Sequence, residues 1–133
     1  MTQLAILQRR DAKRSFCNDG FARLAAFLTV AEVHELLRQI ERYIAEVLPT
    51  RPAEESYYED KRDTGSLKQI QQLWRHDRYF ETLMTKGPFI QLAEELLDGP
   101  VVPRNLQYFN KPAVTGQATP AHQDGFYFML DPC

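Results

Sequence analysis

The chain has 133 residues, of which 44% are hydrophobic, so it is long enough for one domain with a sizeable core and too short for two. Its 16 basic and 18 acidic residues are interspersed and give a formal net charge of -2, which argues against a nucleic-acid or anionic-membrane partner. The two cysteines, Cys17 and Cys133, match no zinc or disulfide spacing, and no stretch approaches a membrane-spanning length. We therefore expect a single domain over residues 1–133, cytoplasmic and with free thiols.

The first predicted elements are a turn, a short strand and a long helix. Asn18–Gly20 has the composition of a turn, and the mostly apolar Phe21–Leu24 after it predicts a short outer strand. Thr29 and Glu32 have the spacing of a capping box, which predicts a helix that begins at this point and ends near Pro49. The apolar residues of this helix recur at helical spacing. They are Val30, Val33, Leu36, Leu37, Ile40, Tyr43, Ile44 and Val47.

The middle of the chain gives weaker signals. Residues 50–65 are rich in charge, which predicts a solvated loop, although substrate contact by Tyr57 or Tyr58 stays open. The segment Ser66–Gln71 is ambiguous. Its Leu67 and Ile70 are spaced for a helical turn, but the segment is short enough for a strand.

Two helices and a strand are predicted next. Asp77 is placed to cap a helix through Met84, and Gly87–Pro88 separates it from a second helix that ends at Gly99–Pro100. Val101–Phe109 follows as a strand. The histidines before this strand, His34 and His76, fall in helical or helix-flanking segments, where exposure or packing is the expected role.

One short motif near the C-terminus carries chemistry. His122 and Asp124 precede a run of aromatic residues, so we expect them to open a strand and to project from the same face. Two histidines and one carboxylate hold the metal in non-haem Fe(II) oxygenases, and this pair would supply two of the three ligands. Because so short a pattern also arises by chance, a surface histidine beside a strand-opening aspartate is the alternative.

The residues around this motif resemble a known family. Asn110–Pro112, a loop, and then Pro120–Phe128 resemble the iron-binding segment of the phytanoyl-CoA dioxygenase family. Asp19–Phe21, followed by Phe27–Thr29 and a long helix, is similar to the family's N-terminal opening. The resemblance extends from about Phe16 to the end of the chain.

The resemblance implies an α+β fold, in which N-terminal helices precede the first strands of a double-stranded β-helix, a jelly-roll of the cupin kind. It also implies an oxygenase that depends on Fe(II) and on 2-oxoglutarate and that hydroxylates a small organic or acyl substrate. His122 and Asp124 would bind the metal, while Lys68, Gln107 and Gln123 would contact the co-substrate. An ordinary exposed lysine and a plain strand glutamine are the alternatives for Lys68 and Gln107.

The family pattern continues beyond what this sequence contains. A distal histidine and an arginine for 2-oxoglutarate follow the metal strand in the family, but no histidine follows His122, and Cys133 is the last residue. We therefore expect the N-terminal portion of the fold, without its C-terminal half, to bind iron weakly and not to turn over. Exposed sheet edges would allow self-association. The alternatives are an inactive half-domain that serves as a binding or assembly module, and a metal-independent, cupin-like binding protein.

Overall fold

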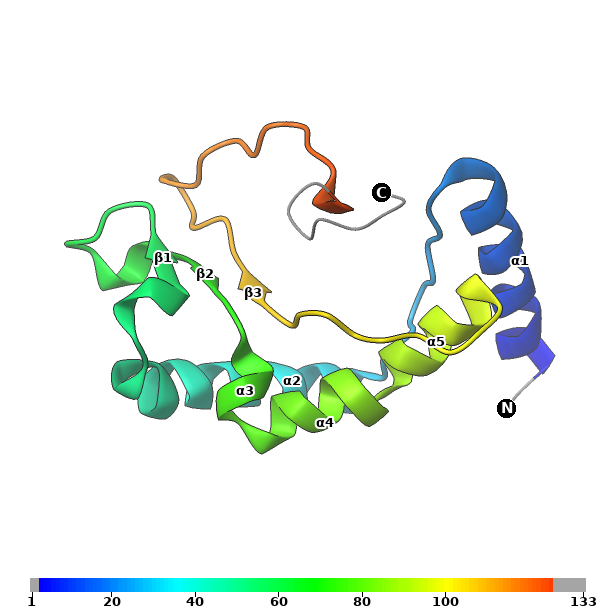
Figure 1. Ribbon diagram of the computed structural model, residues 1–133, viewed down its shortest axis with the longest axis horizontal. Coiled ribbons are helices and arrows are strands. Elements are labelled where there is room, and N and C mark those ends of the chain that lie inside the picture. The colour runs from blue at the N-terminus through cyan, green and yellow to red at the C-terminus, as the bar shows by residue number, and fades with distance from the viewer. Residues whose placement is uncertain (1–2, 126–133) are drawn as a thin grey trace.

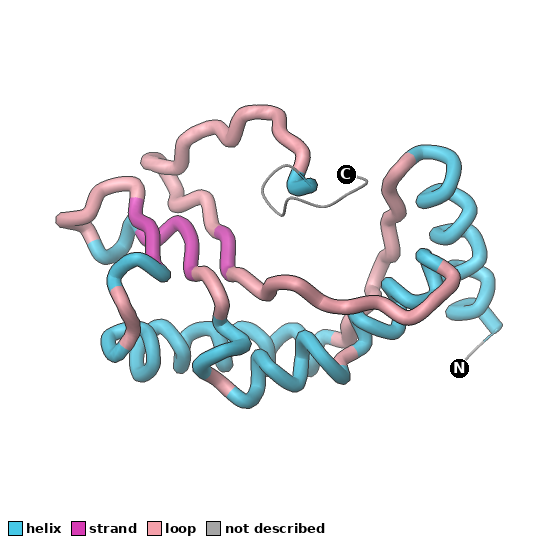
Figure 2. Tube along the Cα trace, viewed as in Figure 1, coloured by secondary structure: helices cyan, strands magenta, loops and turns pink. Residues whose placement is uncertain are grey.

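The computed structural model describes residues 3–125. Figure 1 shows a row of helices along one side of the molecule, a small sheet above one end of this row, and the N-terminal helix at the other end. Figure 2 shows that long loops follow the last helix. Within the described residues, no helix is both long enough and apolar enough to cross a bilayer.

Helix α1, Gln3–Asp19, was not predicted from the sequence. It lies against α5, where Ala12 is buried and where Arg9 and Lys13 pair with Glu95 and Asp98. The predicted turn is in fact the end of this helix, because Gly20 has a φ of +79° and donates its amide to Phe16 at 3.0 Å.

The strand predicted over Phe21–Leu24 is wrong, because these residues have no regular structure. A strand is stable only beside a partner that takes up its backbone hydrogen bonds. The sheet of this protein is built from β1, β2 and β3, all of which come later in the chain. Local apolar composition was therefore not enough to form a strand here.

Helix α2, Val30–Arg42, begins where the sequence predicts. The Thr29 hydroxyl accepts from the Glu32 amide at 3.2 Å, and the Glu32 carboxylate accepts from the Thr29 amide at 2.7 Å, so the capping box is confirmed. The chain continues as a π-helical turn, η1 (Tyr43–Val47), and a 3-10 turn, η2 (Leu48–Thr50). The predicted end near Pro49 is confirmed.

The sheet has three short antiparallel strands in the order β1-β2-β3. Strand β1 is Ser56–Tyr58, β2 is Leu67–Ile70 and β3 is Tyr108–Phe109. The ambiguous segment 66–71 is therefore mainly a strand, and the predicted loop over 50–65 contains β1 and two 3-10 turns, η3 (Ala53–Glu55) and the start of η4 (Thr64–Ser66).

The strand predicted over 101–109 is confirmed only in its last two residues. The reason is that β2 ends at Ile70, and Gln72, with a φ of +56°, turns the chain into α3, Leu73–His76. Residues 101–107 consequently have no strand to pair with, and the Leu106 carbonyl instead accepts from the Leu73 amide at 3.2 Å. Pro103 also lacks an amide hydrogen for a ladder.

Helices α4, Arg78–Lys86, and α5, Pro88–Leu97, confirm the predicted pair. Asp77 caps α4 by accepting from the Tyr79 amide at 2.9 Å. Gly87 is required between the helices, because a Cβ there would lie 2.4 Å from the Leu83 carbonyl oxygen.

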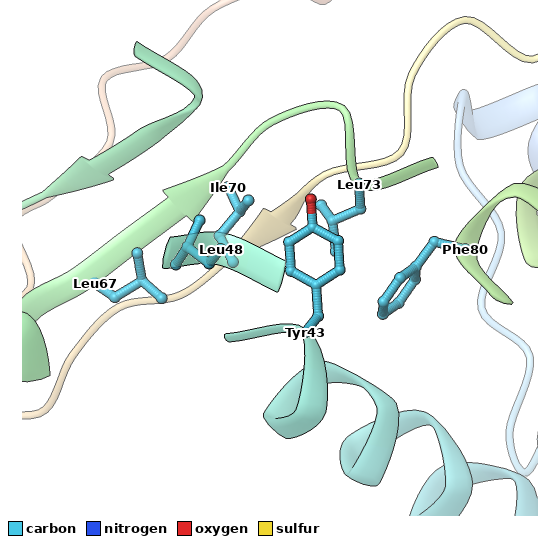
Figure 3. Packing of buried hydrophobic residues seen from close by; sticks show 6 residues of the cluster. All are labelled: Tyr43, Leu48, Leu67, Ile70, Leu73 and Phe80. Carbon is cyan, nitrogen blue, oxygen red and sulfur yellow. The ribbon is translucent and has the colours of Figure 1, made fainter. Parts of the chain in front are cut away.

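The hydrophobic core lies between η1, the sheet and helices α3 and α4 (Figure 3). Tyr43 is fully buried at its centre and meets Phe80 edge to face, with ring centroids 5.5 Å apart. The core thus joins helices to one side of a small sheet, and the fold is α+β as expected. The buried residues of this core are Tyr43, Leu48, Leu67, Ile70, Leu73 and Phe80.

Candidate metal and co-substrate site

The structure departs from the predicted strand at the His-x-Asp motif. Ala121–Gln123 is a loop, and Asp124 and Gly125 are helical. Among the described residues, no strand runs beside this segment to accept its backbone hydrogen bonds, so the local apolar pattern does not form a strand here. The remainder of the predicted strand, residues 126–130, lies outside the described residues.

His122 and Asp124 nevertheless face each other. His122 Nδ1 lies 2.8 Å from the Pro120 carbonyl oxygen, which can only accept, so Nδ1 carries the proton and Nε2 keeps its lone pair in the neutral ring. Nε2 lies 3.5 Å from Asp124 Oδ1. Because 44% of the His122 side chain and 76% of the Asp124 side chain are exposed, an ion can reach both from solvent.

The separation of this pair can be compared with that of two ligands on one metal ion. Two ligand atoms that each lie about 2.1 Å from one ion, at a right angle to each other, are about 3 Å apart, which is shorter than the 3.5 Å between His122 Nε2 and Asp124 Oδ1. Metal-binding histidines commonly donate their other ring N–H to a carbonyl oxygen, as His122 does to Pro120. Within residues 3–125, no group of three or more His, Cys, Asp or Glu side chains could hold a metal.

Lys68 lies at an irregularity of the sheet. Tyr57 pairs with Gln69 and Tyr58 with Leu67, so Lys68 is an extra residue, a β-bulge, between two paired ones. Its ammonium lies 3.1 Å from Glu59 Oε1. A bulge redirects a side chain out of the regular alternation of a strand, which explains how a lysine next to the buried Leu67 reaches a charged partner.

Glu59 connects Lys68 to the loop that leads to His122. The Glu59 carboxylate is 13% exposed and also accepts from the Gln117 backbone amide at 3.2 Å. These two contacts, first Gln117 and then Lys68, lower the pKa of Glu59 from its usual range. Asn110 adds a second connection, because its backbone amide donates to the Lys68 carbonyl at 2.7 Å.

Gln107 and Gln123 lie in different places. Gln107, just before β3, is exposed and accepts from the Gln69 side chain at 2.7 Å, so it lies near Lys68 on the sheet. Gln123 is exposed in the loop between His122 and Asp124. Gln107 thus contacts Gln69 on β2, whereas His122 lies beside Asp124. Figure 1 shows the segment that follows β3 arching away from the sheet.

Comparison with known proteins shows the family. The model of the phytanoyl-CoA dioxygenase (PhyH) family matches residues 16–132. The chain belongs to the phytanoyl-CoA dioxygenase family. No curated protein and no solved structure matches the chain. The matched range includes all five predicted site residues: Lys68, Gln107, His122, Gln123 and Asp124.

The other histidines of this phytanoyl-CoA dioxygenase family member lie on the helices. His34 is exposed on α2. His76, at the end of α3, contacts Arg51 through Nδ1, and its Nε2 lies 2.9 Å from Glu55 Oε2. Both positions agree with the structural roles expected from the sequence.

Sequence reasoning missed Glu59 as a site residue. It belongs to a charged stretch, and such stretches are usually solvated, so nothing local marked it out. Only the pairing of β1 with β2 brings it to Lys68, which follows nine positions later across a turn. In this phytanoyl-CoA dioxygenase family member, Glu59 could have been found by looking for oppositely charged residues on the two sides of a predicted hairpin.

Proposed function

We propose that this protein is an Fe(II)- and 2-oxoglutarate-dependent oxygenase that hydroxylates a small organic or acyl substrate, with His122 and Asp124 as metal ligands. The observation that carries the proposal is the geometry of this pair, in which His122 Nε2 lies 3.5 Å from Asp124 Oδ1. The pair falls inside the range matched by a family of oxygenases. A nitrogen donor beside a hard carboxylate oxygen is a combination that suits Fe(II).

The chain's own residues would orient and hold the reactants. When bound, Fe(II) and 2-oxoglutarate supply the oxidising chemistry that hydroxylates a C–H bond. His122 is held by its hydrogen bond to the Pro120 carbonyl, which fixes the ring and directs Nε2 toward Asp124. The negative charge of Asp124 attracts a divalent cation.

Lys68 would bind a carboxylate of the co-substrate. Its present partner, Glu59, offers the same functional group at 3.1 Å, which supports this role. Co-substrate binding would therefore exchange one carboxylate for another. Gln107, which contacts Gln69 beside Lys68, and the exposed Gln123 would donate additional hydrogen bonds.

We propose that the sheet belongs to a double-stranded β-helix, the fold of the family. The antiparallel sheet seen here is compatible with part of it, because one side packs on helices while Tyr57 and Phe109 on the other side are 45% and 47% exposed. Tyr57, Gln69 and Phe109 are aligned across the three strands, so they share a face that a second sheet could cover.

Metal binding tests the proposal directly. Anaerobic titration of the chain with Fe(II) and 2-oxoglutarate should produce a metal-to-ligand charge-transfer absorption band. The band should be lost in His122→Ala and in Asp124→Ala, because each removes a ligand. His34→Ala is the matched control, since His34 is an exposed histidine on α2, and it should retain the band. An equal band in His122→Ala and the unmodified chain, or no band in either, would overturn the assignment.

Two substitutions test the co-substrate contact separately from the metal. Lys68→Ala should raise the 2-oxoglutarate concentration at half-saturation about tenfold, because a charge-assisted contact is lost. Glu59→Gln should lower it several-fold, because the competing carboxylate is gone. Lys61→Ala, in the neighbouring loop, should leave it unchanged. If Lys68→Ala had no effect, Lys68 would be the ordinary lysine of the alternative interpretation.

A second candidate function is a binding or assembly module without catalysis. The exposed aromatic face of the sheet favours it, because Tyr57 and Phe109 offer apolar area to another chain. Sedimentation velocity over a range of concentrations should then show self-association, weakened by the double substitution Tyr57→Lys and Phe109→Lys. A monomer at all concentrations would exclude self-assembly through this face.

A further inference from the structure

A polar groove lies apart from the His122–Asp124 pair. It is bounded by α3, by one face of α4 and by Arg51, which follows η2. Its volume is about 700 Å³. Cavities of about 300–1,000 Å³ typically hold small molecules, so the groove has room for a ligand of that size.

The groove has an excess of positive charge. Four cationic side chains line it, Arg51, Arg75, Arg78 and Lys86, against the carboxylates of Asp77 and Glu81. Asp77 is already neutralised, because its Oδ2 lies 2.5 Å from Arg42 Nη2. Among the described residues, none of the four cationic side chains has a carboxylate partner. Four positive charges thus face a single uncompensated carboxylate.

The cationic side chains approach the groove from different elements. Arg78 and Lys86 are eight positions apart on α4, which places them near one helix face two turns apart. Arg75, on α3, lies over the ring of Trp74, with its Cζ 5.3 Å from the ring centroid. A ligand between these elements would be contacted from more than one direction.

Arg51 is held in place without losing its charge. Its Nη1 contacts His76 Nδ1, and because a guanidinium can only donate, Nδ1 is the acceptor and Nε2 carries the ring proton. His76 Nε2 then donates to Glu55 Oε1 at 3.2 Å. The buried Nε of Arg51 and the buried Nε1 of Trp74 have no hydrogen-bond partner among the described residues.

We propose that this groove binds a small molecule that carries phosphoryl groups. A phosphoryl group presents acceptor oxygens in several directions, which suits donors that converge from α3, α4 and the segment after η2, whereas a carboxylate offers two oxygens in one plane. Guanidinium groups bind phosphate through paired hydrogen bonds. This binding site is independent of the proposed oxygenase site.

Trp74 makes the groove directly observable, because it is the single tryptophan of the chain and lines the groove. Titration of the full chain with inorganic pyrophosphate at low ionic strength should change the Trp74 fluorescence in a saturable way. Citrate, which carries comparable charge on carboxylates, should need at least about tenfold higher concentration. Addition of salt should weaken pyrophosphate binding.

The decisive variant is the double substitution Arg78→Gln and Lys86→Gln. Both side chains are exposed and unpaired among the described residues, so the fold should persist, which far-UV circular dichroism checks. The pyrophosphate concentration at half-saturation should rise at least about tenfold. The control is the double substitution Lys61→Gln and Arg62→Gln, which removes the same charge from an exposed loop elsewhere. It should change the pyrophosphate concentration at half-saturation less than about twofold.

Three results would overturn the proposal. They are the absence of a saturable fluorescence change, equal affinity for citrate and pyrophosphate, and an equal loss of affinity in the groove variant and in the control variant. The first would show that the groove binds no phosphoryl group. The second and third would show that charge alone, and not this groove, accounts for binding.

Discussion

The carboxylate of Asp77 joins α2 to α4, because its Oδ2 lies 2.5 Å from Arg42 Nη2 while its Oδ1 accepts from the Tyr79 amide at 2.9 Å. Arg42 ends α2, and Asp77 precedes α4. The Asp77 side chain is 9% exposed, so little water competes with these contacts. The Asp77 side chain thus caps α4 and also forms an ion pair with Arg42, which lies 35 positions earlier in the sequence.

Two substitutions at this position should separate its two contacts. Asp77→Ala removes both the helix cap and the ion pair and should lower the free energy of unfolding by about 2–4 kcal/mol. Asp77→Asn retains a good helix cap and loses only the ion pair, so it should lower the free energy of unfolding by about half as much. Urea denaturation followed by circular dichroism measures both, with the exposed Glu54→Ala as control. Equal losses for the two variants would mean that the cap contributes nothing.

The hydroxyl of Tyr43 is a weak point in the core. It is buried and has no hydrogen-bond partner among the described residues, and burial raises the pKa of Tyr43. Tyr43→Phe should therefore increase the free energy of unfolding by about 1 kcal/mol, because an unsatisfied polar group is removed. Tyr43→Ala should decrease it by about 3–5 kcal/mol, because a cavity replaces the ring. Destabilisation by Tyr43→Phe would show that the hydroxyl is bound after all.

Glu59 should restrain the loop that precedes His122. Because the Gln117 amide donates to Glu59 Oε1 at 3.2 Å, Glu59→Ala should increase hydrogen exchange at Gln117 several-fold. Exchange at the Tyr79 amide, which Asp77 holds in α4, should not change. Hydrogen exchange of the two amides can be measured by NMR. Unchanged protection of the Gln117 amide in Glu59→Ala would contradict the proposal that Glu59 restrains this loop.

The free energy of unfolding should decrease at acidic pH, because carboxylates on α2 become protonated and lose their hydrogen bonds. The pKa of Glu35 is lowered to about 2 from its ordinary 4.5, mainly because Arg38 donates hydrogen bonds to it and also because Gln39 does. The pKa of Glu32 is lowered by its hydrogen bonds with Thr29. A carboxyl with a depressed folded-state pKa contributes stability that is present above its unfolded pKa and lost as pH falls through the folded value.

The Glu35 contribution should therefore be complete above about pH 4.5 and should disappear as the pH falls toward about 2. Urea midpoints measured across this range should decline less steeply in Glu35→Gln than in the unmodified chain. Glu54→Gln, an exposed control, should keep the steep decline. The same slope in Glu35→Gln and the unmodified chain would rule out a contribution from Glu35.

Several local features followed from the sequence. The capping box of Thr29 and Glu32, the Asp77 cap and the helix break at Gly87 were all predicted and are all present. Each depends on groups within about one helical turn of one another, so a short window of sequence contains every partner. The family was likewise recognisable from short motifs, and the family match over residues 16–132 confirms it.

The strands were predicted less well. Phe21–Leu24 and the start of 101–109 have apolar composition but no strand beside them, whereas Tyr57, in a charged stretch, pairs with Gln69. At the candidate site, the sequence predicted that His122 and Asp124 face each other, although the backbone that brings them together is a loop and a helical turn. Two side chains that are two positions apart in the sequence can thus lie close together in more than one backbone conformation.

By itself, the sequence determined the capped starts of α2 and α4, the break between α4 and α5, and the family. Only the tertiary structure decided that α1 docks on α5, that Lys68 meets Glu59, and that Arg51 joins α3 and α4 around a groove. The physical reason is the range of the interactions. Helix caps are satisfied within a few residues, but a strand, an ion pair between elements or a groove exists only when distant backbone segments have come together.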